Sequence, residues 1–550
     1  MKVYQRLAHA FKAEGVTATF GMMGDGNMFW LTEMHKIGIR VHEVRHEGAG
    51  LGMADGWARI TRTPGVATAT CGPGTTQLAT AFVTAARASS PLVAFCGEYP
   101  TSDPEYVQRL DQSAFAAGCE VGFVRMGTAD AADEAVRKAF YLAKTENRPI
   151  LLSVPMDLQQ QEWEDDDPYQ PSSTMFTPSV MPPDPKVLER AADMIAKAKH
   201  PVIILGRGAL WSGASEAALK LGDRIGALIA TSLLTRTWLA DKTDYYAGIS
   251  GNYASKASMQ LMHEADLVIG VGASLNRYTL ENGYLYPEAK FLQIDTRPEL
   301  LMFGVRAADL YVRSDAKAGV EGLDKLLAAR NVKATGYHTP DVKEKLAHRT
   351  EDSREFALDP GTVDPRKAIA MLDDLMPLNV GMFAGSGSST GMSNMIMNRP
   401  RPISQNGSFF ACIGQMLPAA IGAMVATGNK PAMLIDGDAS FMMHLAEFET
   451  AVRYGIKLLV VVVNNEALGS EYYKLEVKKL DVKTSQISCP DLGAVATAMG
   501  GKGRLVRNLD DLRTAAKEWL ANPGPMVIDV RISRTVISIP YRRLHYGMDD

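Results

Sequence analysis

The chain has 550 residues, more than one hydrophobic core usually supports, so its length predicts two to four domains. Its formal net charge of −4 argues against a protein that binds nucleic acid or a membrane surface through an excess of basic residues. No apolar run approaches the roughly 20 residues of a membrane-spanning helix, and the five cysteines lack metal-type spacing, so we expect a cytoplasmic protein with free, buried thiols.

Short apolar runs alternate with longer helical patterns along the whole chain. Predicted strands lie at 65–71, 91–97, 149–155, 201–206, 227–232, 267–272, 290–295, 431–437 and 456–465. Predicted helices separate them, at 75–89, at 135–148 and at 440–455 among others. Strands that alternate with helices predict parallel sheets covered on both faces, with ligands at the carboxyl ends of the strands.

Two stretches are predicted to be linkers. The first, 158–186, is acidic and rich in proline and serine, and the second, 335–364, is polar without a sustained apolar period. They predict domains at 1–165, 186–335 and 360–550. The fold class is therefore expected to be α/β, with three doubly wound parallel-sheet domains.

The clearest chemical pattern lies in the third segment. The strand at 431–437 leads into Asp438, and the next strand ends in Asn464 and Asn465. A right-handed crossover would put the Asp438 carboxylate and the Asn465 amide oxygen side by side, and magnesium prefers such hard oxygen ligands. Gly437 permits a tight turn, and a helix beginning at Ala439 and Ser440 would favour an anion. The alternative is an ordinary polar turn after each strand.

The first segment contains a glutamate at the start of a predicted helix. This helix begins near His46 and places Glu47, Ala54 and Ala58 on one face, with glycines that let another surface approach closely. A carboxyl group on a small, apolar stripe suits a proton relay. The alternative is a glutamate favoured in the first turn by the helix dipole.

These motifs resemble those of thiamine-diphosphate-dependent enzymes. GDASF at 437–441 followed by NNE at 464–466 is similar to the GDG–NN signature that binds thiamine diphosphate (ThDP). RHE at 45–47, ADGWAR at 54–59 and GPG at 72–74 resemble the pyrimidine-binding domain of the same superfamily. The resemblance covers nearly the whole chain, as pyrimidine-binding, central Rossmann-like and diphosphate-binding domains. It places the chain with acetolactate synthases, pyruvate decarboxylases and benzaldehyde lyases.

The resemblance implies roles for particular residues. It makes Asp438, Asn465 and the carbonyl of Ala467 the magnesium ligands, and Glu47 the partner of the aminopyrimidine N1′. It also implies that further residues bind the cofactor, namely Pro73 near the rings, Ile413 at the position that bends the cofactor, and Gly385, Ser386 and Gly387 at the diphosphate. The loop at 385–387, after a predicted strand, is alternatively an ordinary turn. The resemblance further implies a homodimer or homotetramer with active sites between subunits.

The reaction is less closely defined by the sequence. The segment at 20–29 resembles a segment of pyruvate and indolepyruvate decarboxylases that carries their catalytic aspartate, and this aspartate matches Asp25. The segment at 110–118 resembles one in relatives of benzaldehyde lyase, which implies that Gln112 faces the substrate. The alternatives are a helix cap for Asp25 and a solvated loop for Gln112. We predict cleavage or formation of a carbon–carbon bond next to a carbonyl, through a ThDP enamine. The enzyme would be an acetolactate-synthase-like carboligase or a 2-oxo-acid decarboxylase, acting on a 2-oxo acid, aldehyde or acyloin-type substrate.

Other functions stay open at this point. The GRG at 206–208 lacks the full dinucleotide fingerprint because position 211 is Trp, and Asn276 and Arg277 match the flavin-contact region of the synthases loosely. FAD is therefore possible without a clear motif. The alternatives are an FAD- and ThDP-dependent 2-oxo-acid oxidase, an acyloin or 2-hydroxyacyl-CoA lyase, and a non-catalytic ThDP-binding paralogue.

Overall fold

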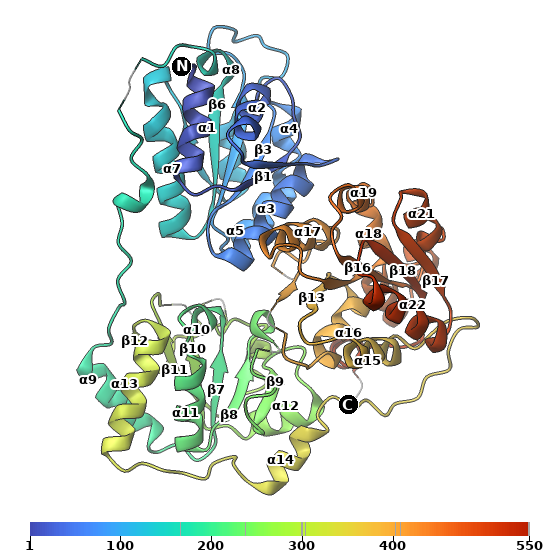
Figure 1. Cartoon of the computed structure of the whole chain (residues 1–550). Coiled ribbons are helices and arrows are strands. Elements are labelled where there is room, and N and C mark those ends of the chain that lie inside the picture. The colour runs from blue at the N-terminus through green and yellow to red at the C-terminus, as the bar shows by residue number, and fades with distance from the viewer. Residues whose placement is uncertain are drawn as a thin grey trace.

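The computed structural model describes residues 1–547 except 165–166, 237, 299–300, 303, 402 and 408. Three six-stranded sheets, each of parallel strands between helices, form three lobes (Figure 1). Apolar runs form the central strands because a parallel strand covered on both faces must be apolar along its length. The predicted fold class is confirmed. Among the described residues, no helix combines the length and apolar character needed to cross a membrane.

The first sheet has the strand order β2-β1-β3-β4-β6-β5. Its strands are β1 (Ala18–Gly21), β2 (Arg40–Glu43), β3 (Gly65–Ala69), β4 (Leu92–Glu98), β5 (Gly122–Arg125) and β6 (Pro149–Pro155). Its helices are α1 (Val3–Ala13), α2 (Met28–Lys36), α3 (Glu47–Thr61), α4 (Pro73–Thr76), α5 (Ala79–Arg87), α6 (Gln112–Gly118), α7 (Ala132–Glu146) and α8 (Met156–Gln159). The helix predicted to begin near His46 is α3, with His46 as its N-cap.

The second sheet has the strand order β12-β11-β10-β7-β8-β9. Its strands are β7 (Pro201–Leu205), β8 (Leu228–Thr231), β9 (Tyr246–Ile249), β10 (Leu267–Val271), β11 (Lys290–Asp295) and β12 (Leu310–Arg313). Its helices are α9 (Pro185–Ile195), α10 (Arg207–Trp211), α11 (Ser215–Ile225), α12 (Lys256–His263), α13 (Ala316–Ala329) and α14 (Pro340–Ala347). Helix α14 lies inside the stretch predicted as the second linker, where only Val342 and Leu346 of the helix are buried.

The third sheet has the strand order β14-β13-β15-β16-β18-β17. Its strands are β13 (Gly381–Ala384), β14 (Ser404–Asn406), β15 (Ala432–Gly437), β16 (Leu458–Asn464), β17 (Lys502–Val506) and β18 (Met526–Arg531). Its helices are α15 (Pro365–Leu375), α16 (Ser388–Ile396), α17 (Met416–Ala426), α18 (Asp438–Met443), α19 (Ala446–Arg453), α20 (Gly469–Val477), α21 (Leu492–Ala498), α22 (Leu509–Ala521) and α23 (Ile539–Tyr546). The single helix predicted over 440–455 is two helices, α18 and α19, because the chain leaves helical geometry at His444 (φ −126°).

The first and third lobes pack through helices α3 and α17, which lie side by side in Figure 1. A Cβ added at Gly56 would overlap the carbonyl oxygen of Ala419, and one added at Gly422 would overlap the carbonyl oxygen of Met53. The two helices therefore approach backbone to backbone, and glycine is required where they cross.

We expect Gly56→Ala to destabilise this helix contact by about 1–3 kcal/mol, because the added methyl group would force the two backbones apart. Calorimetry should show a lower unfolding temperature. Gly118→Ala in α6 is the matched control, because an added Cβ there meets nothing within 4 Å. An unchanged unfolding temperature for Gly56→Ala would contradict the close approach of α3 and α17.

Candidate active site

The predicted magnesium ligands Asp438 and Asn465 lie at one edge of the third sheet. Asp438 is the first residue of α18, directly after β15, and Asn465 directly follows β16. The two strands are neighbours, with Gly437 paired to Val463. Both side chains are almost covered, at 4% and 7% exposure. The structure thus brings a carboxylate and an amide together at the carboxyl end of the sheet, as the crossover argument predicts.

Two buried carboxylates at this edge have no cation beside them. Among the residues that the structure describes, no Lys, Arg or His forms an ion pair with Asp436 or Asp438, and Oδ2 of Asp436 has no hydrogen-bond partner. Burial raises the pKa of Asp436 to about 7 and that of Asp438 to about 6. A bound cation would offset this desolvation. Asp436, inside β15, was not predicted as part of the site.

The chemistry of the donor set fits a hard cation that shares its coordination with a ligand. The described residues contain no group of three or more His, Cys, Asp or Glu placed to hold a metal. One carboxylate, one amide and one carbonyl oxygen would leave further positions for phosphate oxygens, which is the usual arrangement for magnesium.

A polar network holds the turn that follows β16. Oδ1 of Asn465 accepts from the N–H of Ala467 at 3.2 Å, and Asn464 donates to Asp529 at 2.9 Å. Glu466 has a positive φ of 53° and its carboxylate pairs with Arg531 at 2.7 Å. This network presents Asn465 and Ala467 together. Glu466, Asp529 and Arg531 were missed by the sequence argument because Asp529 and Arg531 come from β18, more than 60 residues away.

The glycine-rich loop after β13 lies against the same edge. A Cβ at Gly385 would overlap Oδ1 of Asp436, and Gly387, with φ of 132°, is the N-cap of α16. The hydroxyl of Ser386 donates to the carbonyl of Gly407 at 3.0 Å. A Cβ at Gly437 would meet nothing within 4 Å, so space remains next to it. Because β13 and β15 are parallel neighbours, α16 and α18 begin at the same edge, where their N-termini suit a diphosphate.

Ile413 lies beside helix α18. The N–H of the next residue, Gly414, donates to Oγ of Ser440 at 2.8 Å. The preceding residue, Cys412, has its Sγ 3.3 Å from Oγ1 of Thr84 in the first lobe. Ile413 is therefore held at the contact between the first and third lobes, and its side chain is partly exposed there.

Glu47 lies next to the turn that contains Pro73. It opens α3, where Nδ1 of His46 accepts from the N–H of Gly48 at 3.1 Å. Oε1 of Glu47 is 3.3 Å from where a Cβ of Gly74 would stand. The rings of His46 and His444 have their centroids 5.5 Å apart. The start of α3 thus adjoins the end of α18, and the two predicted regions share one interdomain contact.

Asp25 is exposed in the turn that precedes α2. Asn27, not Asp25, is the N-cap of this helix, so the cap alternative for Asp25 is wrong. Oδ1 of Asn27 accepts from the N–H of Gly24 at 2.8 Å, and its Nδ2 donates to Thr68 at 2.9 Å. The buried Asn27 therefore fixes the turn and leaves the Asp25 carboxylate free to face a ligand.

Gln112 is the first residue of α6 and is only 3% exposed, so the solvated-loop alternative is wrong. Its Nε2 donates to the carbonyl of Gly97 at 2.6 Å, while its Oε1 is buried without a partner. The amide thus holds the carboxyl end of β4 and keeps one free acceptor. A contact between Gln112 and substrate stays a prediction.

A cysteine that was not predicted to take part also lies at this edge of the first sheet. The Sγ of Cys71 donates to Oε1 of Gln108 at 2.9 Å, next to the turn of Pro73. Burial raises the pKa of the Cys71 thiol, so it stays protonated and acts as a donor. The position of Cys71 directly before the GPG motif at 72–74 could have indicated from the sequence that it lies near the site. As expected, all five cysteines are free thiols, with Cys412 and Cys489 only partly buried.

In the central lobe, the glycines of the turn at 206–208 are required by close packing against Gly272. A Cβ at Gly206 would overlap the carbonyl oxygen of Gly272, and Gly208 packs against the same residue. Oδ1 of Asn276 accepts from the N–H groups of Tyr278 and Thr279, both at 3.0 Å, in a local turn. Both motifs thus have a structural role within the chain itself, and flavin binding stays an open alternative without a clear motif.

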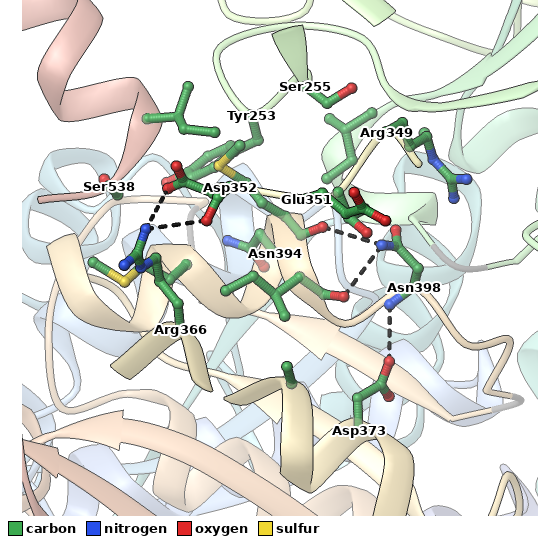
Figure 2. Close-up of a pocket in the computed structure, with 18 of the residues that line it drawn as sticks. Tyr253, Ser255, Arg349, Glu351, Asp352, Arg366, Asp373, Asn394, Asn398 and Ser538 are labelled. Atoms are coloured by element: carbon green, nitrogen blue, oxygen red, sulfur yellow. Dashed lines mark hydrogen bonds and ion pairs between the residues drawn. The ribbon is translucent and has the colours of Figure 1, made fainter. Parts of the chain in front are cut away.

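A cavity of about 480 Å³ lies between the second and third lobes (Figure 2). It is lined by β9, the segment around 349–355, α15 and α16. Its charged groups include a pair between Arg366 and Asp352 at 3.0 Å, and Asp373, which accepts from the N–H of Asn398 at 3.1 Å. None of the predicted site residues lines this cavity, so it is separate from the candidate site.

Comparison with known proteins agrees with this arrangement. Residues 1–115, 188–323 and 385–530 match the N-terminal, central and C-terminal domains of thiamine pyrophosphate enzymes, the first and last described as TPP-binding. The chain is 27% identical to a probable acetolactate synthase large subunit of Methanocaldococcus jannaschii, over 97% of this chain and 92% of that protein. It is 27% identical to the acetolactate synthase isozyme 2 large subunit of Escherichia coli, over 96% and 95%. It is 26% identical to a sulfoacetaldehyde acetyltransferase of Castellaniella defragrans, over 96% and 93%.

The order of the three matched domains is the order of the three sheets, and the candidate site lies where the first and third of them meet. The relatives are synthases and an acetyltransferase, and each aligns with almost the whole of this chain. The chain therefore belongs to the thiamine pyrophosphate enzyme family and is a thiamine-diphosphate-dependent enzyme.

Proposed function

We propose that the enzyme forms or cleaves a carbon–carbon bond next to a carbonyl, as an acetolactate-synthase-like carboligase acting on a 2-oxo acid. The observation that carries this proposal is that the regions of Glu47 and Asp438 meet where the first and third domains contact, with the rings of His46 and His444 5.5 Å apart. The similarity to acetolactate synthases and to a sulfoacetaldehyde acetyltransferase supports transfer of a two-carbon acyl group.

In this proposal the third domain holds the charged end of the cofactor. The carboxylate of Asp438, the amide of Asn465 and the carbonyl of Ala467 hold Mg²⁺. Gly385, Ser386, Gly387 and the first amides of α18 bind the diphosphate. When bound, thiamine diphosphate supplies the electron sink that lets a carbonyl carbon act as a nucleophile.

The first domain moves the proton. Glu47 would be the residue that exchanges a proton with the aminopyrimidine of the cofactor. The adjacent Pro73 and Gly74 would contact the aminopyrimidine ring of the cofactor. Because Gly74 has no side chain, the Glu47 carboxyl has room beside it. From the third domain, the side chain of Ile413 would pack against the cofactor at the contact between the first and third lobes.

One observation favours a second candidate, a 2-oxo-acid decarboxylase. Asp25 is exposed at the carboxyl end of the first sheet in a turn that Asn27 holds rigid, which suits a carboxylate that acts on substrate. In a decarboxylase this group would deliver a proton to the new carbon centre, where a carboligase adds an acceptor carbonyl.

Proton NMR of the purified protein with ThDP, Mg²⁺ and pyruvate tests both candidates. Acetolactate is the expected product, and acetaldehyde would instead support the decarboxylase. A heat-treated sample is the control for uncatalysed loss of pyruvate. Failure to consume pyruvate while ThDP is bound would contradict pyruvate as the donor, and acyloins, diketones and acyl-CoA compounds would be tried next.

The assembly is part of the proposal. A homodimer or homotetramer with active sites between subunits follows from the resemblance, and the sparse, free cysteines favour a cytoplasmic location. Within one chain, the first and third domains already contact through α3 and α17 and bury the glycines at their crossing. The resemblance implies that in the dimer the first domain of one chain faces the third domain of its partner, so that the cofactor site would lie between two chains.

A further inference from the structure

Helix α19 of the third domain contacts the backbone just before Glu47. Oε1 of Glu447 accepts from the N–H of Arg45 at 2.9 Å and from the N–H of His46 at 3.0 Å. The Glu447 side chain is 1% exposed, and its Oε2 accepts from the hydroxyl of Thr450 at 2.8 Å. A buried carboxylate therefore holds two consecutive N–H groups of another domain, and Glu47 is the next residue along the chain.

The same helix holds the rest of this connection. The hydroxyl of Tyr454, at the end of α19, accepts from the N–H of Glu43 at 2.9 Å and donates to the carbonyl of Val41 at 3.5 Å. The guanidinium of Arg453 donates to the carbonyl of Glu43 at 2.9 Å. From β2 to the start of α3, the chain is thus fixed by backbone hydrogen bonds to a single helix of the third domain.

His46 transmits this contact to Glu47. Its backbone N–H is held by Glu447, while its side chain caps α3 through the N–H of Gly48 at 3.1 Å. A shift of the 45–46 backbone would therefore move the first turn of α3, and the Glu47 carboxyl with it. A misplacement of about 1 Å in a catalytic group costs on the order of 100-fold in rate.

We infer that Glu447 is a positioning residue that sets the place of Glu47 relative to the cofactor. This inference rests on the proposed role of Glu47 in proton transfer. A carboxylate suits the task because a charged acceptor binds two N–H groups more strongly than a neutral one. Burial raises the pKa of Glu447, and the Arg45 and His46 N–H groups oppose that shift.

The chain offers a matched control on the same helix. Glu449 also reaches the connection, but through the side chain of Arg45, in a partly exposed ion pair of 2.8 Å, and it pairs with Arg453 of its own helix at 3.4 Å. It does not touch the backbone that leads to Glu47. Glu449→Gln therefore removes an interdomain contact without releasing the positioned segment.

The test measures exchange of the C2 proton of bound ThDP for deuterium by NMR, in holoenzymes saturated with cofactor. Glu447→Asp keeps the charge but draws the carboxylate back by one methylene, and we expect it to slow exchange by about tenfold or more. Glu447→Gln keeps an oxygen at the same reach, and we expect exchange within about threefold of the wild type, because the neutral oxygen still accepts both N–H groups. Glu449→Gln should match the wild type.

Two results would overturn the inference. One is wild-type exchange in Glu447→Asp, and the other is equal slowing in Glu447→Asp and Glu447→Gln, which would show that an acceptor of unchanged reach does not preserve the position of Glu47. Glu47→Gln measured alongside separates the two hypotheses. If Glu47→Gln exchanges normally, the proposed role of Glu47 fails; if only Glu447→Asp exchanges normally, the positioning role alone fails.

Discussion

Glu47→Gln should leave thiamine diphosphate bound and slow both C2 proton exchange and turnover by about 100- to 10,000-fold, the usual contribution of a general acid–base group. The amide fills the same space beside Gly74, where Oε1 now lies 3.3 Å from the position of a Cβ, but it cannot take up and return a proton. Exchange in deuterium oxide, quenched with acid and read by NMR, measures the first step. Steady-state kinetics measures the second.

Glu43→Gln is the matched control for this substitution. Glu43 lies four residues before Glu47 in the same interdomain contact, and its carboxylate forms only an exposed ion pair of 3.7 Å with Arg453. Its loss should change turnover little, since exposed pairs contribute about 0–1 kcal/mol. Unchanged turnover in Glu47→Gln would remove Glu47 from the mechanism.

Asp438→Ala should abolish the magnesium-dependent retention of thiamine diphosphate. Loss of a residue that only supports a metal ligand costs roughly 10–100-fold in affinity, so loss of the sole carboxylate ligand should cost more. Calorimetric titration of ThDP at fixed magnesium, with wild type alongside, gives the affinity. The cofactor-free protein should remain folded, because the substitution removes a buried carboxylate that has no cation partner in the described chain.

Asp438→Asn provides the graded comparison for the metal site. It keeps one oxygen at the same place but removes the charge, so retention should fall between that of the wild type and that of Asp438→Ala. Full retention in Asp438→Ala would show that the metal, or the diphosphate itself, is held elsewhere.

Most central strands of the three sheets are predictable from the sequence, whereas the edges are not, and the buried strands β1 and β18 were not predicted although they lie inside their sheets. The runs at 201–206, 267–272 and 456–465 became β7, β10 and β16, all fully buried. The edge strands β2, β12 and β17 carry exposed positions, and their patterns are too weakly apolar to stand out. Burial on both faces, not strand propensity, made the central strands visible.

The site was predictable where neighbouring strands bring motifs together. Asp438, Asn465 and Gly385 meet because β13, β15 and β16 are adjacent and parallel. The contact between Glu447 and the N–H of His46 joins residues about 400 apart in sequence and depends on how two lobes pack. No local pattern of residues in the sequence predicts how two lobes pack together. The burial of Gln112, whose Nε2 donates to the carbonyl of Gly97, was missed for the same reason.

The crossing of α3 and α17 has a consequence for synthesis of the chain. The first sheet is complete at Pro155, more than 260 residues before Ala419, so at about 5–20 residues per second the first lobe waits roughly 13–53 s for its partner helix. During that interval the small, apolar face of α3 is uncovered in an otherwise finished domain. A nascent chain stalled before 416 should therefore recruit chaperones, and release once α17 has emerged should end that need.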